Sequence, residues 1–184
     1  MNASLFSTIN GWAGNRLADD LMIFAAQYLI IVAVVAFVVA AARSHRRRGP
    51  PVLIGSGVTL VLAFGFGLVA ASLHTEKRPF QSQHVHLLLK HAPGQSFPSD
   101  HATAAFALAL AALVFLSRPV GAALLAIAVM IGFARVYCGV HYPGDILGSL
   151  LVSLLALPFG WLARNRIRRN RKRRAPAMML RPRG

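Results

Sequence analysis

Acidic residues and cysteine are scarce in this chain of 184 residues, which holds five Asp and Glu and one Cys against 20 Lys and Arg. Charged residues make up 14% of the sequence, well below the roughly 25% that is typical of soluble domains. The hydrophobic share of 56% instead indicates an integral membrane protein, and the length indicates one domain. The single Cys138 excludes a framework of intramolecular disulfide bonds and is interpreted most simply as a small packing residue.

A basic segment followed by a short apolar run is missing at the N-terminus, so we expect no cleaved signal peptide. The alternating apolar and polar strands of a membrane barrel are missing as well. Residues 1–16, which include Phe6, Ile9 and Trp12, are expected to form an amphipathic segment at the membrane interface. Beyond them, apolar segments close to the length of a spanning helix predict an all-α bundle of about five transmembrane helices, at residues 17–42, 52–73, 99–116, 120–137 and 143–163.

Positive charge is distributed unevenly over the connections between these helices. If the five helices cross the membrane in turn, one side carries 15 of the 20 Lys and Arg and none of the five acids. The positive-inside rule then predicts a cytoplasmic C-terminus and an outer N-terminus. We divide the chain into a membrane domain at 1–163 and a basic cytoplasmic tail at 164–184. The tail is expected to contact anionic lipid head groups, and it lacks the interleaved aromatic residues of a nucleic-acid binder.

Three polar clusters fall on the opposite, outer side of the predicted membrane. They are "TEKRPF" at 75–80, "FPSDHA" at 97–102 and "ARVYCGVHYPGD" at 134–145. Polar and charged groups are costly in hydrocarbon unless they are solvated or satisfied by partners. Because the topology returns three distant clusters to one membrane level, we expect them to form an active site.

The residue types in these clusters are suited to phosphate chemistry. Arginine presents a planar fork that matches pairs of phosphate oxygens. Ser99 precedes an apolar run and is predicted to cap a helix whose N-terminus favours an anion. Asp145 lies four residues after His141, in the first turn of a helix that Pro143 begins, and is close enough to orient the imidazole. The candidate site residues are Lys77, Arg78, Ser99, His101, Arg135, His141 and Asp145.

These motifs resemble a known family. The Arg-Pro pair at 78–79, "PSDH" at 98–101 and the spacing of Arg135, His141 and Asp145 are similar to the three signatures of the type-2 phosphatidic acid phosphatase superfamily. Within it, "EKRPFQSQHVHLLLKHAPGQSFPSDHA" and "VYCGVHYPGDILGS" resemble most closely the bacterial undecaprenyl-diphosphate phosphatases of the bacitracin-resistance, or BcrC, type. The resemblance implies a bacterial plasma-membrane hydrolase that converts undecaprenyl diphosphate, or another polyprenyl diphosphate, to the monophosphate, which recycles the carrier lipid for cell-wall synthesis.

The same resemblance implies a role for each site residue. His141 would attack the terminal phosphorus and form a phosphohistidine, with Asp145 orienting its imidazole. His101 would protonate the departing lipid phosphate and then activate water. A cation-rich set of this kind needs no metal or other cofactor. The phosphate oxygens would be held by Arg78, Arg135, Ser99 and Lys77.

Three positions depart from the superfamily pattern. Ala71 stands where a Lys usually precedes the first-signature Arg, which leaves Lys77 as the candidate for that cation. Asp100 replaces the usual Gly of the second signature, and it is either a favourable acid in the first turn of a helix or a direct participant. Ala134 replaces a Ser that commonly precedes the third-signature Arg, so one phosphate hydrogen bond is expected to be absent.

Other interpretations of these residues remain open. The segment "HVHLLLKH" at 84–91 is either an interfacial stretch that meets lipid head groups or a lid over the diphosphate or the polyprenyl entrance. A metal site assembled from the histidines and Asp145 is one alternative, although neighbouring arginines disfavour a cation. A transporter is another, although an inverted repeat and polar residues near the middle of the membrane are absent from the sequence. A phosphatase of phosphatidylglycerophosphate or phosphatidic acid is the third.

Overall fold

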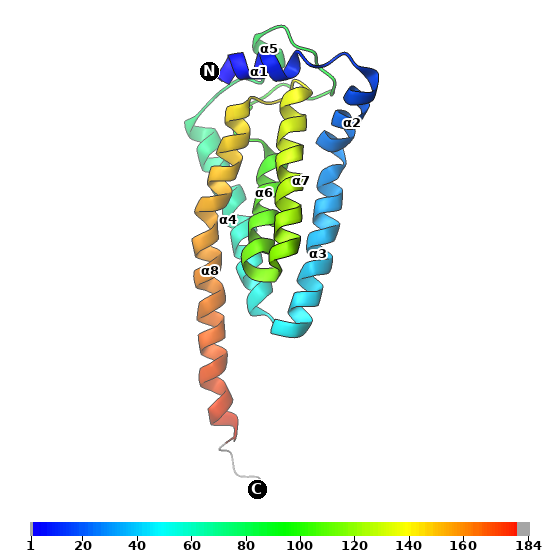
Figure 1. Cartoon of the computed structure of the whole chain (residues 1–184). Coiled ribbons are helices and arrows are strands. Elements are labelled where there is room, and N and C mark those ends of the chain that lie inside the picture. The colour runs from blue at the N-terminus through cyan, green and yellow to red at the C-terminus, as the bar shows by residue number, and fades with distance from the viewer. Residues whose placement is uncertain (1, 180–184) are drawn as a thin grey trace.

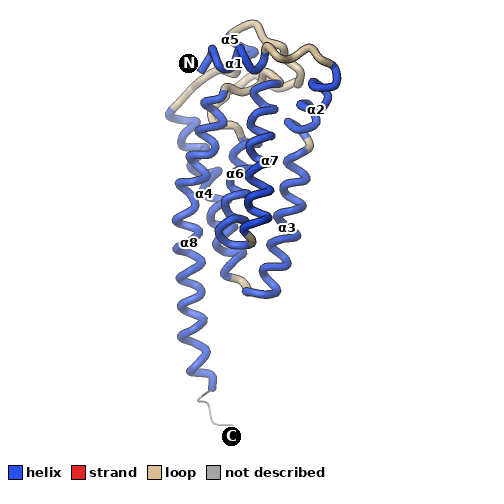
Figure 2. Tube along the Cα trace, viewed as in Figure 1, coloured by secondary structure: helices blue, strands red, loops and turns tan. Residues whose placement is uncertain are grey.

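The chain forms an elongated bundle of helices (Figures 1 and 2). The computed structural model describes residues 2–179, and their side chains as far as residue 171. Within these residues no strand is present, and the predicted all-α membrane bundle is confirmed. The elements are α1 (Asn2–Asn10), α2 (Arg16–Gln27), α3 (Leu29–Arg48), α4 (Pro51–Leu73), α5 (Pro79–Ser82), α6 (Asp100–Ala111), the π-helix η1 (Ala112–Leu116), α7 (Arg118–Tyr137) and α8 (Pro143–Met179).

Four helices of the described chain, α3, α4, α7 and α8, are long and apolar enough to cross a membrane. A fifth, shorter apolar helix is formed by α6 and η1 together, at Asp100–Leu116. This short helix occupies the middle of the bundle and contacts all four long ones (Figure 1). Its sequence is rich in alanine, and small side chains allow neighbouring helices to approach closely. As a result, nine of the twelve residues of α6 are buried.

The first predicted span, at residues 17–42, is wrong as a single helix. The structure divides it into α2 and α3, which meet at Tyr28, and α3 continues to Arg48. The hydroxyl of Tyr137 donates a 2.8 Å hydrogen bond to Asp19 and so fixes α2 to α7. Helix α3 instead packs its apolar side chains against α4, α6 and α7. The basic residues at its end suit the negative pole of the helix dipole, and Gly49 ends it with a φ of 77°.

The N-terminal segment lies across one end of the bundle rather than along it (Figure 1). Phe6 of α1 is 1% exposed and packs against Val136 and Tyr142, whereas Trp12 stays exposed. Asn10 is buried and donates hydrogen bonds to the carbonyls of His86 and Tyr137, at 2.9 and 2.8 Å. Helix α1 therefore ties the loop that contains His86 to the end of α7, above the site described below.

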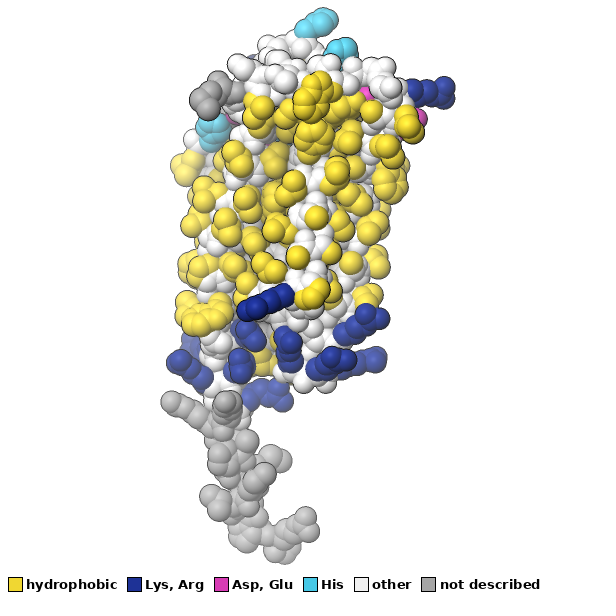
Figure 3. Space-filling view, viewed as in Figure 1, with side chains coloured by type: hydrophobic (Ala, Val, Ile, Leu, Met, Phe, Trp, Pro, Cys, Tyr) yellow, Lys and Arg dark blue, Asp and Glu magenta, His cyan; other side chains and the backbone are white. Residues whose placement is uncertain are grey.

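Helix α8 continues from Pro143 to Met179 without a break at residue 163, where the predicted membrane domain ends. The division into a membrane domain at 1–163 and a tail at 164–184 therefore stays a prediction. Different kinds of basic side chain gather at the two ends of the bundle. Lys and Arg are concentrated at the end where α3 meets α4, while His side chains lie at the end that α1 covers (Figure 3).

Candidate active site

The three polar clusters come together at the end of the bundle that α1 covers. Arg78 caps the N-terminus of α5, Arg135 lies in the last turn of α7, and Asp145 lies in the first turn of α8. His141 sits in the short connection between α7 and α8, which turns at Gly139 with a φ of 81°. A Cβ atom at Gly139 would lie 2.8 Å from the carbonyl oxygen of His86, so glycine suits both the backbone conformation and the close approach.

His141 and Asp145 form a buried pair. Nδ1 of His141 lies 3.2 Å from Oδ2 of Asp145, and the two residues are 1% and 0% exposed. The same carboxylate oxygen accepts hydrogen bonds from the hydroxyl of Ser96 and from the backbone N–H of Tyr142, at 2.5 and 2.8 Å. With these donors fixing the carboxylate, the Nδ1–H of His141 points at Asp145 and its Nε2 faces the opposite way.

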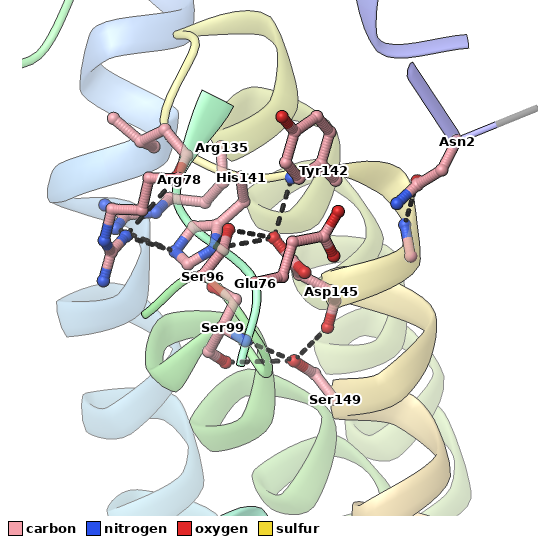
Figure 4. Close-up of polar contacts among 12 residues, drawn as sticks. Asn2, Glu76, Arg78, Ser96, Ser99, Arg135, His141, Tyr142, Asp145 and Ser149 are labelled. Carbon is pink, nitrogen blue, oxygen red and sulfur yellow. Dashed lines mark hydrogen bonds and ion pairs between the residues drawn. The ribbon is translucent and has the colours of Figure 1, made fainter. Parts of the chain in front are cut away.

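Two arginines converge on that free nitrogen. Nη1 of Arg78 lies 3.1 Å from Nε2 of His141, and Nη2 of Arg135 lies 3.5 Å from it. Figure 4 shows the Arg78 guanidinium on one side of the imidazole and the Asp145 carboxylate on the other. Neither arginine forms an ion pair with a carboxylate in the described part of the chain, and the Nε atoms of both are buried without a partner. Buried, unpaired positive charge next to a nucleophilic nitrogen favours an anionic ligand.

Burial lowers the pKa of His141 from 6.5 to about 4, and the positive charges of Arg135 and Arg78 act in the same direction. The hydrogen bond that His141 donates to Asp145 opposes this shift. Burial likewise lowers the pKa of the Arg78 guanidinium, although an arginine remains protonated at neutral pH. The His141 imidazole is therefore neutral at pH 7, with a lone pair available on Nε2.

Backbone pairing fixes the loops that carry Arg78 and Ser96. The N–H of Ser96 donates to the carbonyl of Glu76 at 2.8 Å, and Lys77 pairs with Gln95 through its backbone. The side-chain oxygen of Gln81 accepts from the N–H of Arg78 at 3.2 Å. Segments that are separated by tens of residues in the sequence are therefore connected directly beside the histidine.

Ser99 takes the predicted position at the N-cap of α6. It is fully buried, and its N–H donates to the hydroxyl of Ser149 at 3.1 Å. The Ser149 hydroxyl in turn lies 2.7 Å from the carbonyl oxygen of Asp145, which links the start of α6 to the start of α8. The hydroxyl of Ser99 itself has no partner among the described residues and is free for a ligand oxygen.

The remaining predicted residues lie at greater distance from the pair. His101 is partly exposed in the first turn of α6, and no hydrogen bond joins it to the described site residues. The Lys77 side chain is exposed and also makes no such bond. Asp100, which is exposed too, lines a cavity of about 210 Å³ together with Arg78. The structure therefore brings Arg78, Arg135, His141 and Asp145 into direct contact but not Lys77 or His101.

Residues 84–91 are interpreted either as an interfacial stretch or as a lid over the site, and different members of the segment fit each interpretation. His84 and His86 are exposed, as an interfacial stretch requires. His91 is partly buried, and its ring centroid lies 6.5 Å from that of His141. Burial lowers the pKa of His91, and the nearby Arg78 and Arg135 add to this effect. One member of the segment thus reaches the site.

Sequence reasoning missed Ser96. This serine is completely buried and donates to the Asp145 carboxylate, 49 residues away in the sequence. A serine three residues before the expected helix cap carries no local signal, because its partner is set by the fold of a distant loop. Tyr142 is buried against Phe6, and its backbone N–H donates to the Asp145 carboxylate.

The alternative of a metal site has little geometric support. Among the described residues, His, Cys, Asp and Glu side chains form no group of three or more that could hold a metal ion. The space next to Nε2 of His141 is instead flanked by two guanidinium groups, which repel a cation. The arrangement suits an anion such as a phosphoryl group, with a neutral imidazole placed to attack it.

Comparison with known proteins agrees with this geometry. The model of the PAP2 superfamily matches residues 52–169. Over 156 residues the chain is 34% identical to the undecaprenyl-diphosphatase BcrC of Bacillus subtilis (strain 168), which covers 84% of this chain and 80% of that protein. The fold is similar to that of Aquifex aeolicus LpxE, with a TM-score of 0.67 and 23% identity over 87% of this chain and 94% of that one.

A second solved structure with a similar fold is the PAP2-type phosphatidylglycerolphosphate phosphatase of Bacillus subtilis. Its TM-score is 0.59 at 20% identity, over 92% of this chain and 88% of that one. At such identities the two structures support the fold alone. The family match over most of the bundle, together with the identity to BcrC, confirms the resemblance that the three motifs indicated. The chain belongs to the PAP2 superfamily, the type-2 phosphatidic acid phosphatases.

Proposed function

We propose that this protein hydrolyses undecaprenyl diphosphate, or another polyprenyl diphosphate, to the monophosphate and inorganic phosphate. The observation that carries the proposal is the convergence of Arg78 and Arg135 on the free Nε2 of a buried His141. The choice of substrate is supported by the 34% identity to a protein named undecaprenyl-diphosphatase.

In the first step, Nε2 of His141 attacks the terminal phosphorus. A bond forms between phosphorus and nitrogen, and the bond from phosphorus to the bridging oxygen breaks. The imidazole becomes positively charged, and the Asp145 carboxylate, 3.2 Å from Nδ1, stabilises that charge. His101, in the first turn of α6, donates a proton to the departing lipid phosphate. The product of this step is a phosphohistidine.

In the second step, water attacks the phosphohistidine. His101, now deprotonated, accepts a proton from the water, and the phosphorus–nitrogen bond breaks to release inorganic phosphate and restore neutral His141. Arg78 and Arg135 donate to the phosphoryl oxygens, on which negative charge accumulates in both transition states. Ser99 adds its free hydroxyl at the positive end of α6. Lys77, on the exposed rim, attracts the diphosphate by its charge rather than by contact with the reacting phosphorus.

We further propose that the site faces the outside of a bacterial plasma membrane and that the C-terminus is cytoplasmic. The support is the segregation of arginine at the opposite end of the bundle (Figure 3). In that orientation the enzyme recycles the carrier lipid of cell-wall synthesis. A tag inserted after Gln81 should react with an impermeant reagent in intact cells, and a reporter fused after residue 174 should not. Protection of the tag at Gln81 would show that the site faces the cytoplasm instead.

A glycerophospholipid phosphatase is the second candidate, favoured by the similarity of fold to a phosphatidylglycerolphosphate phosphatase. The two candidate activities are distinguished by measuring how fast purified protein releases phosphate from each member of a substrate panel. The panel holds polyprenyl diphosphates, phosphatidylglycerophosphate and phosphatidic acid. We expect the highest kcat/KM for a polyprenyl diphosphate. A higher kcat/KM for either glycerophospholipid would show that this lipid, rather than a polyprenyl diphosphate, is the preferred substrate. The His141→Ala variant is the control for contaminating phosphatases.

A further inference from the structure

A groove lies at the arginine-rich end of the bundle, at the opposite end from His141. It has a volume of about 640 Å³ and runs between α3, η1 and the start of α7. We propose that this groove binds an anionic phospholipid, with the phosphodiester held by arginine and the acyl chains lying along α3. No described residue of the C-terminal tail lines this groove, and the proposal does not rest on the proposed catalytic activity.

The shape of the groove follows from small side chains on α3. Ala36, Ala40 and Ser44 recur every four residues and therefore lie on one face of the helix. A face of this kind normally allows a neighbouring helix to approach closely. Here Ala40 and Ser44 are buried and form the floor of the groove. Their small side chains leave space above them between α3, η1 and the start of α7.

The charge of the groove is strongly positive. Its lining includes four arginines, Arg43, Arg47, Arg48 and Arg118. The chain has five acidic residues, and all of them belong to segments at the opposite end of the bundle. In the part of the chain with described side chains, none of the four arginines forms an ion pair. Their charge is therefore left for a ligand.

One of these arginines is held in place. Nη1 of Arg48 donates to the carbonyl oxygens of Phe115 and Leu116, at 3.3 and 3.1 Å. These carbonyls lie at the end of the π-helix η1, where the helix stops and its last carbonyls need partners. A guanidinium has five N–H donors, so the fixed Arg48 keeps others free. A phosphodiester in the groove would meet a preorganised donor rather than a mobile side chain.

The apolar part of the lining decides between a lipid and a free anion. Val39 and Val120 line the groove beside the arginines. Further along α3, Val35 and Val38 are 57% and 56% exposed on the apolar surface of the bundle. Inorganic phosphate has no apolar part that could cover this surface, whereas the acyl chains of a phospholipid would cover it. Basic pockets between transmembrane helices are a known kind of site for anionic lipid head groups.

The test is native mass spectrometry of delipidated protein with added phosphatidylglycerol, and with phosphatidylcholine as the zwitterionic control. We expect preferential retention of phosphatidylglycerol. The double variant Arg47→Gln with Arg118→Gln should lower its apparent affinity by about 25-fold, since each basic residue near an anionic lipid contributes about a fivefold factor. The matched control, Arg166→Gln with Arg169→Gln, removes the same charge from α8 outside the groove. It should change the affinity by less than about threefold.

A second variant separates a site from general surface charge. Ser44→Leu keeps every arginine but fills the groove, and it should reduce retention of phosphatidylglycerol at least tenfold. Val120→Phe fills the groove from α7 and replaces Ser44→Leu if thermal unfolding shows that the latter fails to fold. Equal losses in the groove and control variants, or full retention after filling, would overturn the proposal. Displacement of the lipid by millimolar inorganic phosphate would identify a simple anion site instead.

Discussion

Both ends of the bundle hold arginines, but the two ends use them differently. At the end that α1 covers, Arg78 is partly buried and Arg135 is 4% exposed, and both point at one imidazole nitrogen. At the other end, Arg43, Arg47 and Arg118 are exposed around a groove. Electrostatic interactions are stronger in a buried site than in water, where salt screens them. We therefore expect burial, rather than the number of charges, to distinguish the proposed catalytic site from the proposed lipid-binding groove.

The largest effect is expected at the nucleophile. His141→Ala should lower kcat by at least about 10⁴-fold and leave no phosphoenzyme, because the attacking nitrogen is removed. His101→Ala should be impaired in both steps by about 10²–10⁴-fold, yet should still trap some phosphohistidine from a substrate with a good leaving group. Rapid trapping of acid-labile phosphoenzyme with labelled substrate measures both. Label on the His141→Ala protein would mean that another residue is the nucleophile.

The arginines provide the direct comparison between the two ends. Arg78→Ala and Arg135→Ala should each lower kcat/KM by about 10²–10³-fold, because each removes a donor to the transition-state oxygens. Arg166→Gln, at the exposed end, should change kcat/KM by less than about twofold. Steady-state phosphate release in detergent measures all three variants. Comparable losses at both ends would break the distinction between buried and exposed charge.

Ser96 tests whether the buried carboxylate needs all of its donors. Ser96→Ala removes one of the hydrogen bonds to Oδ2 of Asp145, and we expect about a tenfold loss of kcat with little change in KM. Asp145→Asn should cost more, about 10²–10⁴-fold. Ser96→Thr keeps a hydroxyl and should recover part of the activity. If Ser96→Ala raises KM and leaves kcat unchanged, the serine contacts substrate rather than positioning Asp145.

The stability of the folded protein should depend on pH through the buried His141, at the end that α1 covers. The pKa of His141 is about 4 in the folded protein because of burial, against 6.5 when exposed. The folded state therefore binds this proton less readily than the unfolded state, so the stability from His141 is fully present above pH 6.5 and is lost as the pH falls toward 4. Thermal unfolding between pH 7 and 4 should show a smaller fall in Tm for His141→Asn than for the native protein. An identical fall would exclude a buried neutral imidazole.

The smallest effect is expected from removing divalent metal ions. The guanidinium groups of Arg78 and Arg135 lie beside Nε2 of His141, where they can stabilise the charge of a phosphoryl group without a metal ion. Activity in detergent should therefore stay within about twofold in excess chelator. Phosphate release before and after addition of EDTA measures this. Loss of activity that a single divalent ion restores would contradict the phosphohistidine mechanism.

The sequence predicted much of the fold because membrane helices have a strong and local signal. The length of the apolar segments placed α4, α6 with η1 and α7 to within a few residues. The break at Tyr28 could not be found in this way. No Pro or Gly marks it, and α2 is fixed by the distant Tyr137. The end of α8 was missed for a related reason, since a charged segment outside the membrane can still continue a helix.

The sequence alone determined which residues could form the site. The spacing of Arg135, His141 and Asp145 and the motif around Ser99 specified both a phosphate-binding chemistry and a family. These residues are close together in the sequence or follow from helix geometry, so they are visible without a structure. Only the tertiary structure decided which of the cations meet His141. Arg78 reaches it while Lys77, the next residue in the chain, does not, because the orientation of a loop side chain is set by its packing. The contact of Ser96 with Asp145 and the groove beside α3 have the same origin, since both join segments that only the packed bundle brings together.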